Sequence, residues 1–370
     1  MPKAKETVLE INLNALEHNY RYITSRINNS TNVLGVVKAF GYGSDAVSVA
    51  NSLAQLGVAY FGVAYTSEGE ELRNGGIQTP ILVLHPQSIN FNKIVNRCLE
   101  PSIYSFNMLT KFIEFAESKN QKSYPIHLKF NTGLNRLGFT EFDIDEIIKK
   151  LAKTESVKVK SVFSHLAASE DLNEKVFTEK QLQRFNRIAL ELEESLQYSF
   201  TRHTLNTSGV LNYPNSQYEM VRTGIGLYGF GNNAKENKNL QPVATLKTII
   251  SQIHILNEGD TIGYNRAMTA TQNMKTATLP IGHTDGINRA YGNTIGWVTI
   301  NGKKAPIVGN VCMDMIMVDV SKIDCNEGDE VIIFGDKGST AEELSAAINS
   351  IPYELLTAIS QRVKRVICRK

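Results

Sequence analysis

Short apolar runs alternate with longer amphipathic segments over residues 33–235. The clearest runs are apolar almost throughout, and they cover residues 33–37, 58–65, 80–84, 125–130 and 157–166. Strands that are apolar on both faces are typical of a parallel sheet covered by helices. Between the runs, apolar residues recur every three or four positions, which predicts helices over 44–56, 88–96, 106–118, 140–152 and 172–196.

Three weaker apolar runs extend the strand pattern, at residues 102–104, 201–206 and 218–222. They bring the number of predicted strands to about eight, with short connections throughout, which is the strand number of a (βα)8 barrel. An open doubly wound sheet is the alternative, but the count favours the barrel. We therefore predict an α/β protein with an N-terminal (βα)8 TIM-type barrel over residues 10–240.

The chain changes character on both sides of this predicted barrel. Ahead of it, Asn14 followed by Glu17 suits a helix start, and one helical face carries Leu16, Tyr20, Ile23 and Ile27. After about residue 240, β-branched runs broken by turn residues predict a mostly antiparallel β unit. Asn301-Gly302 predicts a type I′ hairpin turn. A capping box at Thr340 and Glu343 predicts a final pair of helices that continue to residue 366.

Composition indicates an ordinary globular protein of two unequal units. The chain has 370 residues, 42% hydrophobic and 21% charged, so it can bury a core, and a barrel of about 250 residues leaves a remainder. Lys+Arg 39 against Asp+Glu 37 gives a net charge of +2, without a basic run suited to nucleic acid. The four cysteines are widely spaced, so we expect no disulfide framework and no metal site.

The N-terminal residues lack the apolar stretch of a signal peptide. The most apolar stretch elsewhere, residues 56–65, is about half a membrane span. These two observations predict a cytoplasmic protein without a membrane partner.

Residues 36–46, VVKAFGYGSDA, are the first candidate for chemistry. One interpretation is a dinucleotide-binding turn, with Gly41, Gly43 and Ala46 in the G-x-G-x-x-[G/A] pattern and Glu68 further along the chain. The second centres on Lys38, which follows the first barrel strand, at the end of a barrel that carries active sites. A lysine in such a pocket suits Schiff-base chemistry with pyridoxal phosphate. A surface lysine in an ordinary turn is the third interpretation.

The loops after the seventh and eighth predicted strands favour pyridoxal phosphate. Barrels often build a phosphate site from these two loops. The first loop offers Asn206, Thr207 and Ser208, and the second is the glycine-rich run Arg222–Gly226. Its glycines let backbone N–H groups approach an anion, although glycine-rich loops are common in α/β proteins.

Eight ordered motifs then resemble those of the alanine racemases. They are VKAFGYG, LKFNTGLNRLGF, FSHLAAS, VRTGIGLYGF, IGYNRA, PIGHTDG, GNVCMDM and IPYELLTAISQRV, spread from about Val8 to Val366. The resemblance implies interconversion of L- and D-alanine with pyridoxal 5'-phosphate, supplying D-alanine for peptidoglycan. It also implies a homodimer with shared active sites, in which residues 1–9 plus 241–370 form a C-terminal domain that completes the partner's site.

The resemblance assigns the acid/base roles to Lys38, which carries the cofactor, and to Tyr264 from the partner subunit. Racemisation removes a proton from one face of a carbon and returns one to the other, so two bases are required. Cofactor binding falls to Lys38, Tyr42, His165, Asn206, Thr207, Arg222, Gly224, Ile225 and Tyr353. Arg222 matches the arginine that faces the cofactor's ring nitrogen, and His165 links this arginine towards the tyrosine.

Substrate contacts are assigned by resemblance to Arg136 and to the main-chain N–H of Met313. Lys129 matches a lysine that many members carry as a carbamate, which would hold Arg136 in place. Cys312 is then a neighbour of the site and not a nucleophile; a small buried apolar role is the interpretation we prefer.

Four positions depart from the family pattern: Phe40 in place of Asn, Asn131 in place of Asp, His283 in place of Tyr, and Asn310 in place of Arg. Asn131 removes a charge near Lys129, and His283 and Asn310 fall where the substrate approaches. These departures concern the substrate range and not the type of reaction, so a broader or serine-preferring racemase of the same fold is the first alternative. Two alternatives of other classes are a non-catalytic pyridoxal phosphate carrier and a decarboxylase of similar architecture. A carrier would lack the β domain, and a decarboxylase would need an acidic partner for the ring nitrogen.

Overall fold

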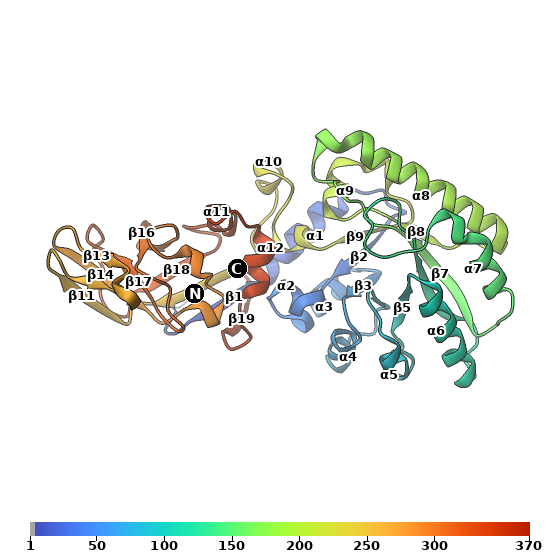
Figure 1. Ribbon diagram of the computed structural model, residues 1–370, viewed down its shortest axis with the longest axis horizontal. Helices are drawn as coiled ribbons and strands as arrows, with labels where there is room; N and C mark the ends of the chain where they lie inside the picture. Colours follow the sequence, from blue (N-terminus) through green and yellow to red (C-terminus); the bar gives the residue numbers. More distant parts are fainter. Residues whose placement is uncertain (1–3) are drawn as a thin grey trace.

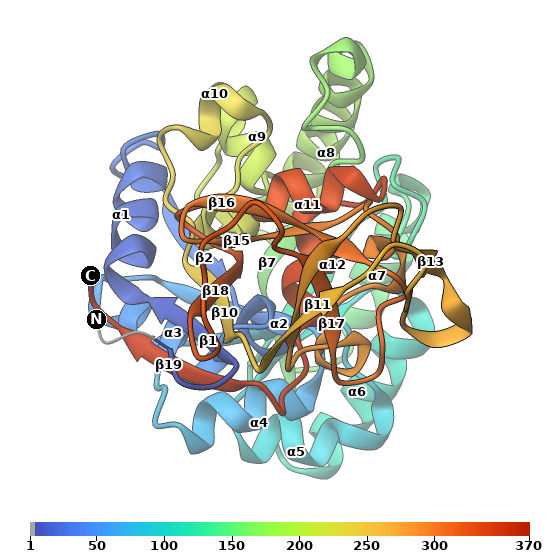
Figure 2. The same ribbon diagram turned by 90° about the vertical axis from the view of Figure 1, so that its left-hand side faces the viewer.

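The computed structural model describes residues 4–370, which form a barrel and a β unit that lie side by side (Figure 1). Residues 1–3 of the N-terminal segment assigned to the second domain lie outside the described residues. Seen along the long axis, the β unit covers the face of the barrel (Figure 2). The C-terminal end of the chain lies near the junction of the two parts in Figure 1.

Eight parallel strands form the barrel, in the order β8-β7-β6-β5-β4-β3-β2-β9. Strands β8 and β9 close it as neighbours without a shared ladder. The predicted (βα)8 architecture is confirmed, including the three weak strands. The bounds are β2 (Asn32–Val36), β3 (Tyr60–Val63), β4 (Ile81–Val83), β5 (Glu100–Ile103), β6 (Tyr124–Lys129), β7 (Val157–Phe163), β8 (Thr201–His203) and β9 (Met220–Thr223).

Helices surround the barrel because their apolar stripes pack on its outer face. Helix α6 shows this clearly: Ser105 caps it, and Met108, Leu109, Phe112 and Ala116 are its buried residues. The helices are α1 (Leu13–Thr24), α2 (Lys38–Tyr42), α3 (Ala46–Gln55), α4 (Thr66–Asn74), α5 (Phe91–Asn96), α6 (Phe106–Ser118), α7 (Ile144–Leu151), α8 (Lys175–Leu196), α9 (Thr207–Asn212) and α10 (Ala234–Asn237).

The second unit is built on a nine-stranded, mostly antiparallel sheet in the order β11-β14-β17-β16-β15-β18-β10-β1-β19. Its strands are β1 (Val8–Asn12), β10 (Ala244–Ile249), β11 (Gln252–Leu256), β14 (Met274–Leu279), β15 (Trp297–Ile300), β16 (Lys303–Val308), β17 (Ile316–Asp319), β18 (Glu330–Phe334) and β19 (Lys364–Cys368). Strands β12 (Thr261–Ile262) and β13 (Met268–Thr269) form a separate pair, and helices α11 (Ala341–Ala347) and α12 (Pro352–Ala358) follow β18.

Two local predictions in this unit are confirmed. Asn301 and Gly302 both have positive φ, 48° and 76°, in the turn between β15 and β16, as a type I′ turn requires. Thr340 and Glu343 form the capping box of α11.

Three details of the sequence prediction are wrong. The first helix is capped by Asn12, whose side chain accepts from Asn14 N and Ala15 N, so its cap lies two residues before the predicted one. Residues 364–368 form a strand, because they pair in parallel with β1 from the other end of the chain. Helix α4 was not predicted, because its exposed face is rich in glutamate and its apolar stripe is short. Among residues 4–370, no helix is long and apolar enough to cross a bilayer.

Candidate active site

A cavity of about 400 Å³ opens at the C-terminal ends of the barrel strands. Eleven of the residues assigned above line it: Lys38, Tyr42, Lys129, Arg136, His165, Asn206, Thr207, Arg222, Gly224, Ile225 and Tyr353. All but Tyr353 follow or end a barrel strand, and Tyr353 comes from α12 of the second unit. The fold therefore gathers these side chains from positions up to 315 residues apart, between Lys38 and Tyr353.

Lys38 opens a left-handed turn directly after β2. Ala39, Phe40, Gly41 and Tyr42 all have φ between 53° and 62°, a conformation that costs about 1–2 kcal/mol for each residue with a Cβ. The Glu68 carboxylate stabilises the turn by accepting from Ala39 N at 2.7 Å. Such a strained segment persists only where its surroundings hold it, which is typical of functional sites.

The dinucleotide interpretation of this turn is not supported by the structure. The same Glu68 carboxylate also accepts from Ala64 N at 2.6 Å and from Tyr65 N at 3.0 Å. Its oxygens are thus committed to three backbone N–H groups, which leaves this carboxylate engaged within the protein and not presented to a ribose.

The phosphate-binding candidates surround the Thr207 hydroxyl. Thr207 Oγ1 accepts from Gly224 N at 3.2 Å and from Gly226 N at 3.3 Å, so its own proton points elsewhere. Ile225 N has no hydrogen-bond partner in the part of the chain that the structure describes. Asn206 caps α9 by accepting from Gly209 N at 2.8 Å. A hydroxyl and a backbone N–H are therefore left to donate to an anion.

Gly224 lies against the Tyr42 hydroxyl, which places a further hydrogen-bond donor beside the candidate phosphate site. A Cβ at Gly224 would lie only 2.2 Å from Tyr42 Oη, so glycine is required there. The Tyr42 ring stacks on Tyr228, with centroids 4.5 Å apart, and lies 5.9 Å from the Tyr353 ring. Burial raises the pKa of Tyr42 far above its usual range, so its hydroxyl remains a donor.

Arg222 is a buried cation with four hydrogen-bonding neighbours. Its Nη1 donates to His203 Nδ1 and His203 O, both at 2.9 Å. Its Nη2 lies 2.7 Å from Ser164 O, 2.9 Å from Thr204 O and 3.2 Å from His165 Nδ1. Burial lowers the pKa of Arg222 to about 9, which leaves it protonated at neutral pH. Within residues 4–370 its Nε–H has no protein partner, so this donor is left for a ligand acceptor such as a ring nitrogen.

Positive charge dominates the cavity. Burial, and then Arg136, lowers the pKa of Lys38 from its ordinary value and lowers that of Lys129 to about 8. Burial, followed by the Arg222 charge, holds the pKa of His165 well below its usual range. Four cationic residues around a small cavity suit a ligand with several negative charges, as a phosphate and a carboxylate together provide.

Tyr264 and Met313 lie elsewhere, on the second unit. They line a separate groove of about 530 Å³ together with Cys312 and Asp314. Tyr264 is 73% exposed and Met313 58% exposed in the single chain. The structure therefore does not bring these two residues to the cavity of Lys38 within one chain.

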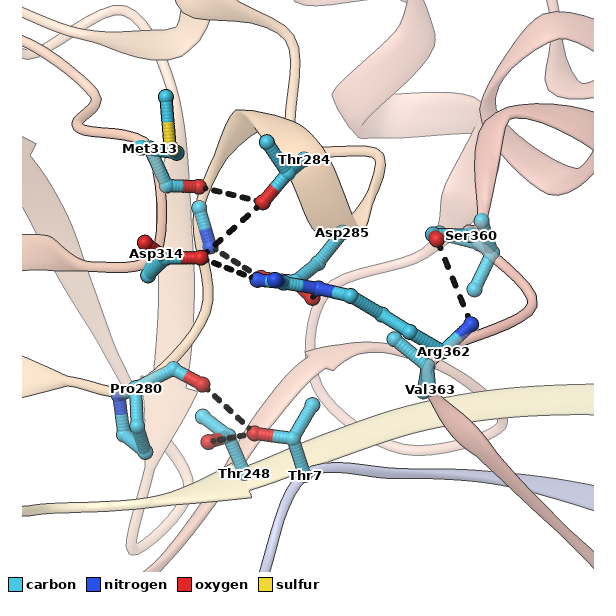
Figure 3. Close-up of polar contacts among 12 residues, drawn as sticks. Thr7, Thr248, Pro280, Thr284, Asp285, Met313, Asp314, Ser360, Arg362 and Val363 are labelled. Atoms are coloured by element: carbon cyan, nitrogen blue, oxygen red, sulfur yellow. Dashed lines mark hydrogen bonds and ion pairs between the residues drawn. The ribbon is translucent and has the colours of Figure 1, made fainter.

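The loop that carries Met313 is held by polar contacts with the segment after Pro280 (Figure 3). Thr284 Oγ1 donates to Met313 O at 2.9 Å, and Arg362 Nε donates to Asp285 Oδ1 at 2.6 Å. Arg362 also pairs with Asp314. His283 N donates to Cys312 O at 2.9 Å, and Met313 N has no partner among the residues described. Burial raises the pKa of Cys312, which fits a neighbour and not a nucleophile.

The departures from the family pattern have local structural roles. Asn131 Oδ1 accepts from Gly133 N and Asn135 N, so it stabilises the turn before Arg136. Asn310 Nδ2 donates to Tyr264 O at 3.1 Å. The Phe40 ring lies 5.5 Å from the Arg365 guanidinium carbon.

Several residues of the cavity were not found by sequence reasoning. His85, Phe163 and Leu137 line it, and the Nδ1 atom of His85 is buried without a partner among the residues described. His203 was also missed, although it accepts from Arg222. A lone histidine after an apolar run gives no signal that separates a core residue from a functional one.

Two family models match nearly the whole chain. The model described as "Alanine racemase, N-terminal domain" matches residues 11–231, and "Alanine racemase, C-terminal domain" matches residues 243–367. The chain belongs to the alanine racemase family. The eight motifs and the barrel with its β unit agree with this membership.

Relatives in this family are similar over their full lengths. "Alanine racemase 2" of Caldanaerobacter subterraneus is 35% identical over 98% of this chain and 95% of its own. The solved alanine racemase of Clostridium difficile 630 matches with a TM-score of 0.93 and 34% identity, covering 99% of this chain and 97% of its own. The Bartonella henselae alanine racemase, solved with covalently bound pyridoxal phosphate, matches with a TM-score of 0.89 and 28% identity, covering 99% and 100%.

Proposed function

We propose that this chain interconverts L- and D-alanine with pyridoxal phosphate held on Lys38. The observation that carries the proposal is the shared cavity of Lys38, the Arg222 guanidinium and the Thr207–Gly224 cradle. When bound, pyridoxal phosphate withdraws electrons from the substrate's Cα and so makes its proton acidic. The remaining steps depend on the chain's own residues.

The phosphate group would be held by Thr207, Tyr42 and the Ile225 N–H, each of which has a donor left to offer. Arg222 would direct its Nε–H at the ring nitrogen. Because burial lowers its pKa only to about 9, Arg222 remains a donor there and does not accept a proton. A guanidinium at this position would keep its proton, so the ring would be a weaker electron sink than one paired with a carboxylate, and side reactions such as transamination would be restrained.

Lys38 and Tyr264 would act as the two bases, on opposite faces of the substrate carbon. Lys38 is suited to accept a proton because burial and Arg136 lower its pKa. Tyr264 would come from the partner subunit of a homodimer, since it is exposed on the second unit and lies outside the Lys38 cavity. In this arrangement residues 241–370 and the N-terminal strand complete the partner's site.

His165 would link Arg222 to that tyrosine. Its Nδ1 lies 3.2 Å from Arg222 Nη2, which can only donate, so the proton of neutral His165 is on Nε2. The Nε2–H would then donate to the Tyr264 oxygen and stabilise its phenolate. This contact would favour the deprotonated form that a base requires.

The substrate carboxylate would be bound by Met313 N–H and Arg136. Met313 N has no other partner among the described residues, and the Thr284 and Arg362 contacts hold its loop. A broader or serine-preferring range is the second candidate, favoured by His283 and Asn310 near Tyr264 and Met313. Supply of D-alanine to peptidoglycan remains a prediction of the family resemblance, and a cytoplasmic location remains a prediction from the sequence pattern.

The test is a racemisation assay on the purified protein with L-alanine and L-serine, together with its visible absorbance spectrum. We expect D-alanine to form faster than D-serine, with an absorbance band of lysine-bound cofactor. Lys38→Ala should lose both the band and the activity, whereas Lys93→Ala, on the exposed surface of α5, should keep both. Full activity in Lys38→Ala would overturn the proposal.

A further inference from the structure

Five polar side chains form a hydrogen-bonded chain through the interior of the barrel. Each comes from a different strand: Glu100 from β5, His127 from β6, Ser161 from β7, His203 from β8 and Arg222 from β9. The contacts are Glu100 Oε2 to His127 Nε2 at 2.7 Å, His127 Nδ1 to Ser161 Oγ at 2.5 Å, and Ser161 Oγ to His203 Nε2 at 2.9 Å. The last contact, His203 Nδ1 to Arg222 Nη1 at 2.9 Å, spans the seam between β8 and β9.

This hydrogen-bonded path connects the two ends of the barrel. His127, Ser161 and His203 are at most 1% exposed, and Arg222 is 5% exposed. Glu100 begins β5 and lies beside a cavity of about 670 Å³ at the N-terminal ends of the strands, where Tyr60 Oη donates to it at 3.1 Å. Barrel interiors are ordinarily filled by branched apolar side chains, so a continuous polar path through the interior is unusual and indicates a role beyond packing.

The hydrogen positions along the path follow from its two ends. A guanidinium has only donors, so Arg222 donates to His203 Nδ1, and the proton of neutral His203 must be on Nε2. His203 Nε2–H then donates to Ser161, which leaves the Ser161 hydroxyl to donate to His127 Nδ1. His127 therefore carries its proton on Nε2 and donates to the Glu100 carboxylate.

Every donor along the path thus points from the cation towards the anion. Burial, and then the Arg222 charge, holds the pKa of His203 well below its usual range, in agreement with a neutral ring. No carboxylate contacts Arg222 within residues 4–370, so Glu100 is the acceptor that ends its hydrogen-bonded path. The Phe163 ring stacks on His203, with an interplanar angle of 7°, and fixes the ring plane.

We infer that Glu100, His127 and Ser161 are positioning residues of the active site, which hold His203 in the tautomer that accepts from Arg222. In the other tautomer, His203 Nδ1–H and Arg222 Nη1–H would face each other as two donors. Arg222 would then rotate, and its Nε–H would no longer be directed into the cavity. This inference rests on the proposed function, because it assigns the path a role in presenting Arg222 to the cofactor.

The test compares Ser161→Ala, which breaks the path, with Ser161→Thr, which keeps a hydroxyl at the same place. The histidine tautomers are read in the holoenzyme by two-bond 1H–15N NMR correlation, which is tractable because the chain has 7 histidines. His203 and His127 are assigned from His203→Gln and His127→Gln. In wild type we expect both rings to carry a proton on Nε2 alone.

Ser161→Ala should give a mixture of His203 tautomers and a kcat about 5–20-fold lower, the effect of one lost buried hydrogen bond, with KM within about twofold. Ser161→Thr should return both readouts to wild type. Glu100→Gln, with the same shape at the accessible end, should also mix the tautomers, because an amide can accept or donate.

A wild-type His203 with its proton on Nδ1 would overturn the inference. So would a Ser161→Ala holoenzyme with unchanged tautomer and kcat. If the wild-type protein failed to racemise alanine, the proposed function would fall while the tautomer measurement would still report on the path.

Discussion

The Arg365 guanidinium, on the last strand of the chain, donates from Nη2 to the main-chain oxygen of Gly43 at 2.8 Å. Its Nε lies 3.2 Å from Ser44 O and its charge lies over the Phe40 ring. The left-handed turn that begins at Lys38 is thus held by a residue of the second unit. Phe40, one of the four departures from the family pattern, supplies the aromatic face of that contact.

Arg365→Lys should weaken this support. Lysine cannot reproduce the forked contacts to Gly43 and Ser44, so we expect the free energy of unfolding to fall by about 1–3 kcal/mol. The affinity of the apoprotein for pyridoxal phosphate should fall as well, because the turn presents Lys38. Urea denaturation and cofactor titration measure both quantities. Arg369→Lys, at an exposed position of the same chain end, is the matched control, and equal behaviour of the two variants would contradict the prediction.

Gly224→Ala should disrupt the phosphate cradle. The added Cβ would meet Tyr42 Oη at 2.2 Å, and Tyr42 is packed against Tyr228. We expect cofactor affinity to fall at least about tenfold, the loss expected when a buried contact must be rebuilt. The same clash should lower the thermal stability of Gly224→Ala. In Gly224→Ala/Tyr42→Phe the nearest ring atom would be Cζ at 3.0 Å, so the double variant should regain part of that thermal stability. A double variant no more stable than the single one would argue against this contact.

Lys129 should react with carbon dioxide to form a carbamate. Burial and Arg136 lower the pKa of Lys129 to about 8. The neutral amine is the nucleophile, so at pH 8 about half of the Lys129 side chains are in the reactive form. The carbamate should increase as pH rises from about 7 to 9 and should be lost at acidic pH. 13C NMR of holoenzyme in 13C-labelled bicarbonate should show a carbamate signal that is absent in Lys129→Gln. A spectrum without that signal at pH 9 would exclude the modification.

Asn310→Ala should reduce catalysis without affecting the cofactor. Asn310 Nδ2 donates to Tyr264 O, so its loss frees the segment that carries the proposed second base. One neutral hydrogen bond corresponds to about 1 kcal/mol, so kcat should fall about fivefold while the cofactor absorbance stays unchanged. Asn310→Asp keeps the shape but lacks the donor, and it should behave like Asn310→Ala. An unchanged kcat in both variants would show that Asn310 does not position Tyr264.

The sequence predicted what depends on local pattern. Apolar runs, three of them weak, identified all eight barrel strands, and Thr340 with Glu343 identified a helix start. The strand at residues 364–368 was missed because its partner is β1, at the opposite end of the chain. The site residues were assigned through family motifs, which also assigned Tyr264 to the partner subunit; the hydrophobic pattern alone gives neither assignment. Glu100, His127 and Ser161 were missed because each is a single polar residue in a different strand, and only the closed barrel joins them.

Subunit complementation tests the central claim most directly, namely that Lys38 of one chain works with Tyr264 of its partner. Lys38→Ala and Tyr264→Phe proteins, each inactive or nearly so alone, are unfolded together, refolded with pyridoxal phosphate and assayed for D-alanine formation. A shared site predicts recovery of about a quarter of wild-type activity, because half of the dimers are mixed and each mixed dimer has one intact site. Activity no greater than the sum of the two separate variants would contradict the account.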